Sequence, residues 1–395
     1  MAIESFGTER AARKLRLGMV GGGRGAFIGA VHRMAARLDD KWDIVAGALS
    51  ANPENAKLSG QDLGLSDDRI YTSWEDMAEK EATRDDGIDA VSIVTPNQLH
   101  FGPAKAFLER GINVICDKPM TLDLEEAKEL VKIARASECQ FVLTQNNTGY
   151  PLVRQARAMV ADGTLGTIQV VRASYVQDWL TTALDQEGQK QAAWRTDPKQ
   201  AGAGGSIGDI GVHAFNLASF ITGLELDEVC ADLRSYVPNR QLDDNANVLL
   251  RYQGGASGTL WTSQVAPGNY NRLSIEVYGT KGGIQWVGED NDNLYYTPLG
   301  EPTRCITRGG PGAMDVANAA TRMPPRHPEG YIEGFGNLYS NAAEMIWAKR
   351  EGREPDRFAT DLPTVEDGAR GLAFIEACVR SSQNGASWEK VSWGA

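Results

Sequence analysis

Apolar runs alternate with helical patterns along the first third of the chain. The apolar stretch that ends at Gly21 predicts a buried strand, and a helical period follows it. Amphipathic segments then separate further β-rich runs. The predicted strands are 43–49, 90–94, 113–116 and 141–144, and the predicted helices are 73–82, 103–110 and 123–136. This rhythm is typical of a parallel sheet with helices on its faces.

The pattern changes after Tyr150. A predicted helix at 151–161 leads into longer strand-like runs, which indicate a largely antiparallel sheet. Two terminal helical patterns are expected to cover that sheet or to return to the first domain. The predicted strands are 167–176, 247–252, 257–264 and 273–278, and the terminal helices are 331–349 and 365–381. We therefore expect two domains, 1–147 and 148–395.

Composition narrows the class of partner. The 395 residues carry 40 basic and 52 acidic side chains, so the net charge is −12, which argues against nucleic acid and anionic membranes as partners. The start of the chain is polar, and no apolar run approaches membrane-spanning length. The five cysteines are scattered without a C-x-x-C pair, which favours a reducing, cytoplasmic setting and no zinc site.

Residues 17–26 (LGMVGGGRGA) predict a strand that breaks into a glycine turn and opens a helix, the arrangement that cradles a dinucleotide pyrophosphate. Gly21 permits the tight turn, Gly23 allows close backbone approach, and Ala26 is small enough for the helix to lie against the strand. Glycine triplets are also common in ordinary loops. The cofactor-binding residues predicted at this turn are Gly21, Gly23, Arg24, Ala26, Phe27 and Ile28.

Three further motifs carry candidate chemistry. Residues 95–100 (TPNQLH) follow one predicted strand, and residues 117–119 (DKP) follow the next. Ligands of parallel sheets bind at such carboxyl ends. In the glycine-rich run 202–213, Asp209 and His213 are four residues apart and share one face if helical, which suits acid/base chemistry. A surface lysine at 118 and a structural histidine at 213 are the competing interpretations.

Together these motifs resemble the Gfo/Idh/MocA oxidoreductases, a family named after glucose-fructose oxidoreductase, inositol dehydrogenase and a rhizopine catabolism protein. The resemblance covers nearly the whole chain: the glycine turn, the T-P-N-x-x-H run, a K-P pair and D-x-G-x-H occur in the family's order. Asp117 stands where the family usually has glutamate, and Asn216 where aspartate is common. The second departure removes a carboxylate from the substrate region.

The resemblance implies an α/β fold: an N-terminal Rossmann domain with a doubly wound parallel sheet, and a C-terminal α/β domain with a large, mostly antiparallel open sheet that often supplies the oligomer interface. We therefore expect a homo-oligomer, a dimer or a tetramer. By analogy His213 is the general base, Asp209 orients its ring, and Lys118 holds the reacting oxygen. The further cofactor-binding residues that the resemblance implies are Thr95, Asn97, His100, Asp117, Lys118, Trp194 and Arg195.

The choice of cofactor depends on the residue after the second predicted strand. Ser50 stands there, where a carboxylate would hold the ribose of NAD, and no arginine is adjacent. Lys57 is the nearest basic residue along this segment, so a 2′-phosphate would be poorly neutralised. NAD is favoured, with NADP kept open.

Substrate contacts are expected from segments that face the nicotinamide in related enzymes. Trp194 offers an apolar face to sugar C–H groups and Arg195 a fork of donors, although a core tryptophan and a solvated arginine are equally simple interpretations. The expected substrate-binding residues are Asn147, Tyr150, Arg195, His213, His327 and Tyr331. The acidic run 243–245 is interpreted as an Asx-rich turn, and no metal is assigned.

The sequence thus predicts an NAD(P)-dependent dehydrogenase of a sugar, anhydrosugar, glycoside or cyclic polyol. One alternative is a glycoside hydrolase or lyase in which bound NAD transiently oxidises a sugar carbon and is regenerated. Because Lys118, Asp209 and His213 would serve both chemistries, their spacing does not separate them. A catalytically silent nucleotide-binding regulator is a third possibility.

Overall fold

The computed structural model describes residues 13–394, and packing divides the chain into two units. The first contains the residues up to Gly149 together with Tyr331–Ala369; the second contains Tyr150–Gly330 and the residues from Arg370 onward. This differs from the expected single division after residue 147, because helix α11 (Tyr331–Glu351) packs with the first unit. Helix α12 (Val365–Gln383) crosses from one unit to the other.

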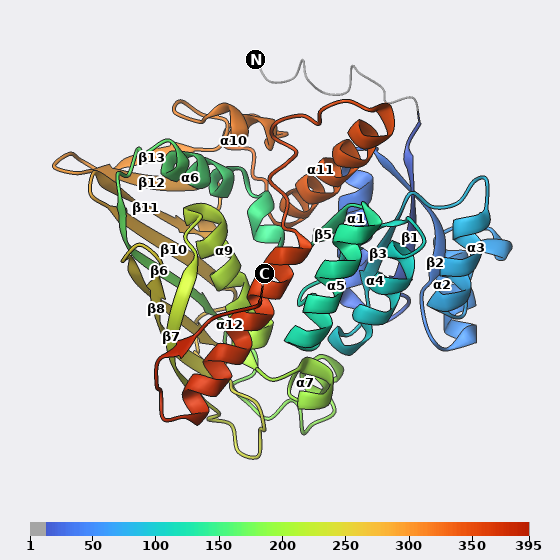
Figure 1. The fold of residues 1–395 in the computed structure, drawn as a ribbon, viewed down its shortest axis with the longest axis horizontal. Coiled ribbons are helices and arrows are strands. Elements are labelled where there is room, and N and C mark those ends of the chain that lie inside the picture. Colours follow the sequence, from blue (N-terminus) through green and yellow to red (C-terminus); the bar gives the residue numbers. More distant parts are fainter. Residues whose placement is uncertain (1–12, 395) are drawn as a thin grey trace. The chain divides into compact units, whose positions relative to one another are not determined.

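The first unit contains a parallel five-stranded sheet in the order β2-β1-β3-β4-β5 (Figure 1). The order reverses between β1 and β3, so the sheet is doubly wound and the carboxyl ends of its strands form one edge. The predicted Rossmann sheet is confirmed. Its strands are β1 Leu15–Gly21, β2 Trp42–Ala48, β3 Ala90–Val94, β4 Asn113–Cys116 and β5 Phe141–Leu143.

Helices of this unit begin at side-chain caps that the sequence supplies. Asn52, Ser73 and Asp123 each accept the backbone N–H of the residue three positions on, which satisfies a donor that the helix itself leaves unpaired. The helices besides α11 are α1 Phe27–Leu38, α2 Pro53–Asp62, α3 Trp74–Thr83, α4 Phe101–Leu108 and α5 Leu124–Ser137, with short 3-10 turns η2 Asp67–Arg69, η3 Asn97–Leu99 and η4 Asn146–Gly149. Helix α2 is not predicted by the hydrophobic pattern.

A buried polar group ties α11 to the sheet. His32 of α1 lies with Nδ1 2.9 Å from the Tyr339 hydroxyl and 3.2 Å from Ser92 Oγ, and Ser92 Oγ is 2.9 Å from the same hydroxyl. Trp42 of β2 donates its indole N–H to the Tyr339 carbonyl at 2.9 Å. Helix α1 and strands β2 and β3 therefore hold one residue of α11. Burial lowers the pKa of His32 to about 4.

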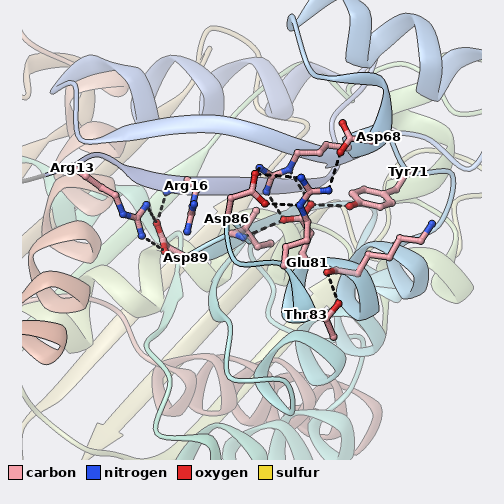
Figure 2. Close-up of polar contacts among 12 residues, drawn as sticks. Arg13, Arg16, Asp68, Tyr71, Glu81, Thr83, Asp86 and Asp89 are labelled. Carbon is pink, nitrogen blue, oxygen red and sulfur yellow. Dashed lines mark hydrogen bonds and ion pairs between the residues drawn. The ribbon is translucent and has the colours of Figure 1, made fainter.

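A second buried network orders the outer part of this unit (Figure 2). The carboxylate of Glu81 accepts from the Tyr71 hydroxyl at 2.8 Å, from Arg69 Nε at 3.1 Å and from the Ile88 N–H at 3.1 Å. Both oxygens of Glu81 accept hydrogen bonds, and this offsets the free-energy cost of burying a carboxylate. The network fixes α3 to the turn that follows α2, so its role is structural.

The second unit is built on a nine-stranded sheet in the order β13-β12-β11-β10-β6-β9-β8-β7-β14. Every neighbouring pair is antiparallel except β6 and β9, which confirms the expected mostly antiparallel sheet. The strands are β6 Ile168–Val176, β7 Leu226–Arg234, β8 Asn245–Tyr252, β9 Ser257–Ser263, β10 Arg272–Gly279, β11 Gly282–Val287, β12 Asn293–Pro298, β13 Arg304–Thr307 and β14 Glu389–Lys390.

Helices α6 (Pro151–Ala161) and α9 (Val212–Thr222) cover one face of this sheet (Figure 1). Side chains on that face, such as Val171, Leu260 and Ile275, are buried, whereas their neighbours along each strand point to the other, exposed face. The remaining short elements are α7 Lys190–Arg195, α8 Pro198–Ala201, η5 Ile207–Gly211, η6 Gly288–Asp290 and α10 Asp315–Ala319. No helix within residues 13–394 combines the length and hydropathy needed to cross a bilayer.

The buried His32 makes the stability of the first unit depend on pH. Its unfolded form binds a proton near pH 6.5 and its folded form only near pH 4, so stability is lost as pH falls through this window. We expect this group to contribute a loss of about 3 kcal/mol between pH 6.5 and 4. Native-state hydrogen exchange of β1 and β3 amides measures it. The variant His32→Gln should show a flatter pH dependence, and an equal slope in both proteins would contradict the assignment.

Candidate functional site

The glycine turn after β1 depends on backbone contact. Gly21 and Gly22 have φ values of +82° and +75°, which side-chain-bearing residues rarely adopt. A Cβ added to Gly29 would lie 2.4 Å from the Gly22 Cα, so strand end and helix touch through these two glycines. Ala26 stands at the N-cap of α1 instead. The close contact between helix and strand, which the sequence analysis assigned to Ala26, is therefore made at Gly29.

The same turn is fastened to the end of β2. Gly23 donates its N–H to the Leu49 carbonyl at 3.1 Å, and a Cβ on Gly23 would lie 2.7 Å from that oxygen. The Arg24 N–H donates to Ser59 Oγ of α2 at 2.9 Å. Of the other residues predicted here, Ile28 is partly buried, and Phe27 is 68% exposed. The turn and the residue predicted to meet the ribose, Ser50, thus lie in one region.

The turn after β3 is held by its histidine. His100 is buried, with Nε2 2.8 Å from the Thr95 carbonyl and Nδ1 2.7 Å from the Pro119 carbonyl. It ties this turn to the one after β4, so it shapes the edge of the sheet. Thr95 donates its hydroxyl to the Leu99 carbonyl at 3.0 Å, and Asn97 is buried in η3.

Asp117 connects the ends of β4 and β5. Its Oδ1 accepts from the Lys118 N–H at 2.9 Å and from the Thr144 hydroxyl at 3.0 Å. The shorter side chain thus fixes the backbone beside Lys118. Lys118 itself follows β4 at the carboxyl edge of the parallel sheet. Both residues occupy the edge at which ligands of such sheets bind.

Two residues that the sequence analysis did not single out follow β5 at this edge. Gln145 is 2% exposed and its Oε1 is buried without a hydrogen-bond partner among the described residues; Asn146 Nδ2 is in the same state. Buried polar atoms of this kind are normally satisfied by a ligand or water. Their position directly after a predicted strand was the available signal. With the glycine turn, they fit a dinucleotide.

In the second unit, a buried carboxylate anchors the glycine-rich run. Asp243 accepts from the Gly205 N–H at 2.6 Å, from the Ser206 hydroxyl at 2.8 Å and from the Ile207 N–H at 2.9 Å. A Cβ on Gly205 would lie 2.0 Å from the Asp243 carbonyl oxygen, which explains the glycine. Burial raises the pKa of Asp243, and these donors oppose the rise. Asp243, from the run expected to be an Asx-rich turn, thus anchors the start of η5, the π-helical turn that carries Asp209.

Two donors hold Asp209. Gln264 Nε2 donates to its Oδ2 at 2.8 Å, and Arg195 Nε lies 3.3 Å from the same oxygen. Arg195 is itself placed over the ring of Trp194, with its Cζ 4.2 Å from the ring centroid, and bonded to Gln191 Oε1 at 2.7 Å. Sequence reasoning missed Gln264, because nothing local distinguishes the residue after a strand as the partner of a distant carboxylate.

His213 is the second residue of α9, one turn after Asp209, and is 8% exposed. Its ring meets that of Tyr175 edge-on, with centroids 5.8 Å apart. Burial raises the pKa of the Tyr175 hydroxyl, and the nearby Asp209 and Tyr150 act in the same direction. The second unit thus brings the predicted residues Tyr150, Asp209 and His213 to Tyr175, and it brings Arg195 to Asp209.

The remaining predicted substrate contacts belong to other segments of the chain. Asn147 is buried in η4, and Tyr331 begins α11, both in the first unit. His327 is exposed on a loop of the second unit that the buried Arg308 fastens by hydrogen bonds to the Met323 and His327 carbonyls. Asn216, where the family commonly has aspartate, is buried on α9. Their contacts with a substrate stay predictions.

A cavity of about 400 Å³ opens on the second unit, away from this cluster. Trp261, one of its lining residues, points to the opposite face of β9 from Thr262, which pairs with Tyr175. The cavity thus lies on the exposed face and His213 on the covered face. Its lining residues are Thr181, Tyr236, Val237, Pro238, Asn245, Trp261, Ser263, Val265 and Ala266.

Comparison with known proteins supports the same class. Residues 15–156 match an oxidoreductase family with an NAD-binding Rossmann fold, and residues 153–285 match the GFO/IDH/MocA C-terminal domain. The uncharacterized oxidoreductase YfiI of Bacillus subtilis is 36% identical over 95% of this chain and 97% of its own length. Levoglucosan dehydrogenase of Pseudarthrobacter phenanthrenivorans is 28% identical over 71% and 76%.

Solved structures agree with these relatives. An oxidoreductase from Sinorhizobium meliloti is 53% identical with a TM-score of 0.86, covering 95% of this chain and 99% of its own. An inositol dehydrogenase homolog from Azotobacter vinelandii, solved with NAD+, is 34% identical with a TM-score of 0.91 over 97% and 99%. The chain therefore belongs to the Gfo/Idh/MocA family and is an NAD-binding oxidoreductase, as its sequence motifs predicted.

The contact between Gly22 and Gly29 is testable against the alternative at Ala26. Gly29→Ala should displace α1 from β1, and we expect it to weaken NAD+ binding at least about tenfold and to lower the melting temperature. Ala26→Gly changes only an N-cap position, which tolerates glycine, and should bind NAD+ as the wild type does. Calorimetric titration with NAD+ measures both. The reverse order of effects would return the packing role to Ala26.

Proposed function

We propose that this protein is an NAD-dependent dehydrogenase that oxidises a hydroxyl group of a sugar, anhydrosugar, glycoside or cyclic polyol. The observation that supports it most is the cluster of the second unit, where Gln264 and Arg195 hold Asp209 one turn before a buried His213. The relatives named above as levoglucosan dehydrogenase and inositol dehydrogenase homolog support the same class of substrate.

In this proposal His213 accepts the proton of the substrate hydroxyl, because an imidazole is the side chain whose pKa lies nearest to neutral pH. Asp209 stabilises the ring that has gained this proton, and its carboxylate is held in place by Gln264 and Arg195. Lys118 favours the developing negative charge on the oxygen. NAD, when bound, supplies the acceptor for the hydride that leaves the same carbon.

Aromatic and hydrogen-bonding side chains around the cluster suit a hydroxylated ring. The Tyr175 hydroxyl donates to Asn271 at 2.8 Å, and the Trp179 indole donates to Gln177 at 2.9 Å. Flat apolar faces beside fixed polar groups bind C–H and O–H groups of a carbohydrate together. This mixture of side chains supports the proposed substrate class.

Replacing the base tests the proposal. His213→Ala should lower kcat by about 10²- to 10⁴-fold, because proton transfer loses its acceptor, while the dissociation constant for NAD+ stays unchanged. A panel of sugars, glycosides and polyols is assayed for NADH absorbance and for released products in the same wells. Unchanged turnover would remove His213 from the mechanism. Cleavage without NADH would establish the redox-assisted hydrolase or lyase instead.

We further propose that copies of the chain associate through the exposed face of the nine-stranded sheet. Val170, Leu249, Trp261 and Tyr295 lie on this face by register and are each at least one-third exposed. Apolar side chains spread over one sheet face are typical of an association surface.

Charge placed on this face should break the association. We expect Leu249→Lys to shift the protein toward the monomer, because a buried lysine would have no partner in the interface. Sedimentation velocity measures the mass, and Glu301→Gln, which adds the same single positive charge on an exposed loop of the same unit, controls for the change of charge. A wild-type monomer, or a variant that keeps the wild-type mass, would contradict the proposed surface.

A reducing, cytoplasmic compartment is proposed on the state of the thiols. All five cysteines are free, and burial raises the pKa of Cys116 and Cys378, which keeps these two thiols protonated and unreactive.

A further inference from the structure

Arg24 of the glycine turn is engaged by a carboxylate. Its Nε lies 2.5 Å from Asp62 Oδ2 and its Nη2 2.6 Å from Asp62 Oδ1, so the planar guanidinium meets both carboxylate oxygens. The side chains are 48% and 49% exposed. The pair lowers the pKa of Asp62 and raises that of Arg24. Arg24 therefore presents a largely neutralised group at the surface.

The backbone of Arg24 lies in the region where the adenosine ribose of a dinucleotide is expected. Its N–H donates to Ser59 of α2, and the preceding glycine donates to the Leu49 carbonyl, immediately before Ser50. In this fold, the residue after the second strand meets the 2′-hydroxyl of NAD, and an arginine nearby receives the 2′-phosphate of NADP. By its position, Arg24 is a candidate to bind the 2′-phosphate of NADP.

The ion pair directs Arg24 toward the far end of α2. Asp62 is the last residue of this helix and Pro53 the first, and nine steps of 1.5 Å separate the two ends by about 14 Å. Ser50 precedes the near end by three residues, and its hydroxyl accepts the Asn52 N–H at 3.2 Å. The Asp62 carboxylate is therefore too far along α2 to contact a ribose bound at Ser50. It acts on the cofactor site through Arg24.

We propose that Asp62 is a specificity-determining residue of the cofactor site: its ion pair withholds the Arg24 guanidinium from a 2′-phosphate and so favours NAD over NADP. The inference rests on the NAD-binding activity described above. A 2′-phosphate would have to displace two charge-assisted hydrogen bonds before Arg24 could bind it, whereas the 2′-hydroxyl of NAD makes no such demand. Selectivity thus arises from a residue outside the ribose position itself.

Asp62→Asn tests the proposal by direct binding, without substrate. Titration of the purified full chain with NAD+ and with NADP+, followed by calorimetry, gives the ratio of the two dissociation constants. We expect the variant to bind NADP+ about tenfold more tightly than the wild type, with NAD+ affinity unchanged. Glu129→Gln is the matched control, because it removes one exposed carboxylate from an ion pair of the same unit, that with Lys105 at 2.6 Å. It should alter neither affinity.

The double variant Arg24→Ala with Asp62→Asn separates release of Arg24 from simple loss of negative charge. The ratio of the dissociation constants for NAD+ and NADP+ in this double variant should return to the wild-type value. A ratio in Asp62→Asn equal to that in Glu129→Gln, or a gain that persists without Arg24, would overturn the proposal, as would a wild type that prefers NADP+. Failure of the wild type to bind either dinucleotide would instead contradict the proposed function. Exposed ion pairs contribute little to stability, so the variants should fold, and thermal melting checks this.

Discussion

The contact of Gly22 with Gly29 is the constraint on which the first unit depends. At this point β1 and α1 approach until only hydrogen atoms fit between their backbones, so the turn between them is short. The turn then bonds to the end of β2 and to α2, and in this way the positions of Arg24, Ser50 and Asp62 follow from the glycine contact.

In the second unit, the buried carboxylate of Asp243 fixes the turn that carries the site residues. Asp243 collects three donors from the start of the glycine-rich run, and a carboxylate in the interior is stable only with such a set. The turn that it anchors brings Asp209 to Gln264 and Arg195. Asp209 is thus held both by its own contacts and by the anchored start of the turn that carries it.

Local patterns predicted the parts of the fold whose signal is local. Strands β3 and β4 were predicted at their observed bounds, because short apolar runs between turn residues have one plausible structure. Helix α2 was missed since its polar sequence shows little periodicity, and β7 and β11–β13 were missed because their pairing comes from distant strands. The return of α11 to the first unit depends on the His32 and Tyr339 contact, which no local pattern contains.

The sequence by itself determined the two-part α/β class, the dinucleotide turn and the order of the family motifs. Each of these depends on the types and spacing of residues that are neighbours along the chain. Only the tertiary structure decided that Gly29 and not Ala26 makes the close contact, that Asp243 starts the turn of Asp209, that Gln264 holds this carboxylate, and that Asp62 occupies Arg24. These are contacts between residues up to 55 positions apart. Such contacts are set by the packing of whole elements, and a side chain shows no preference for its distant partner until the chain has folded.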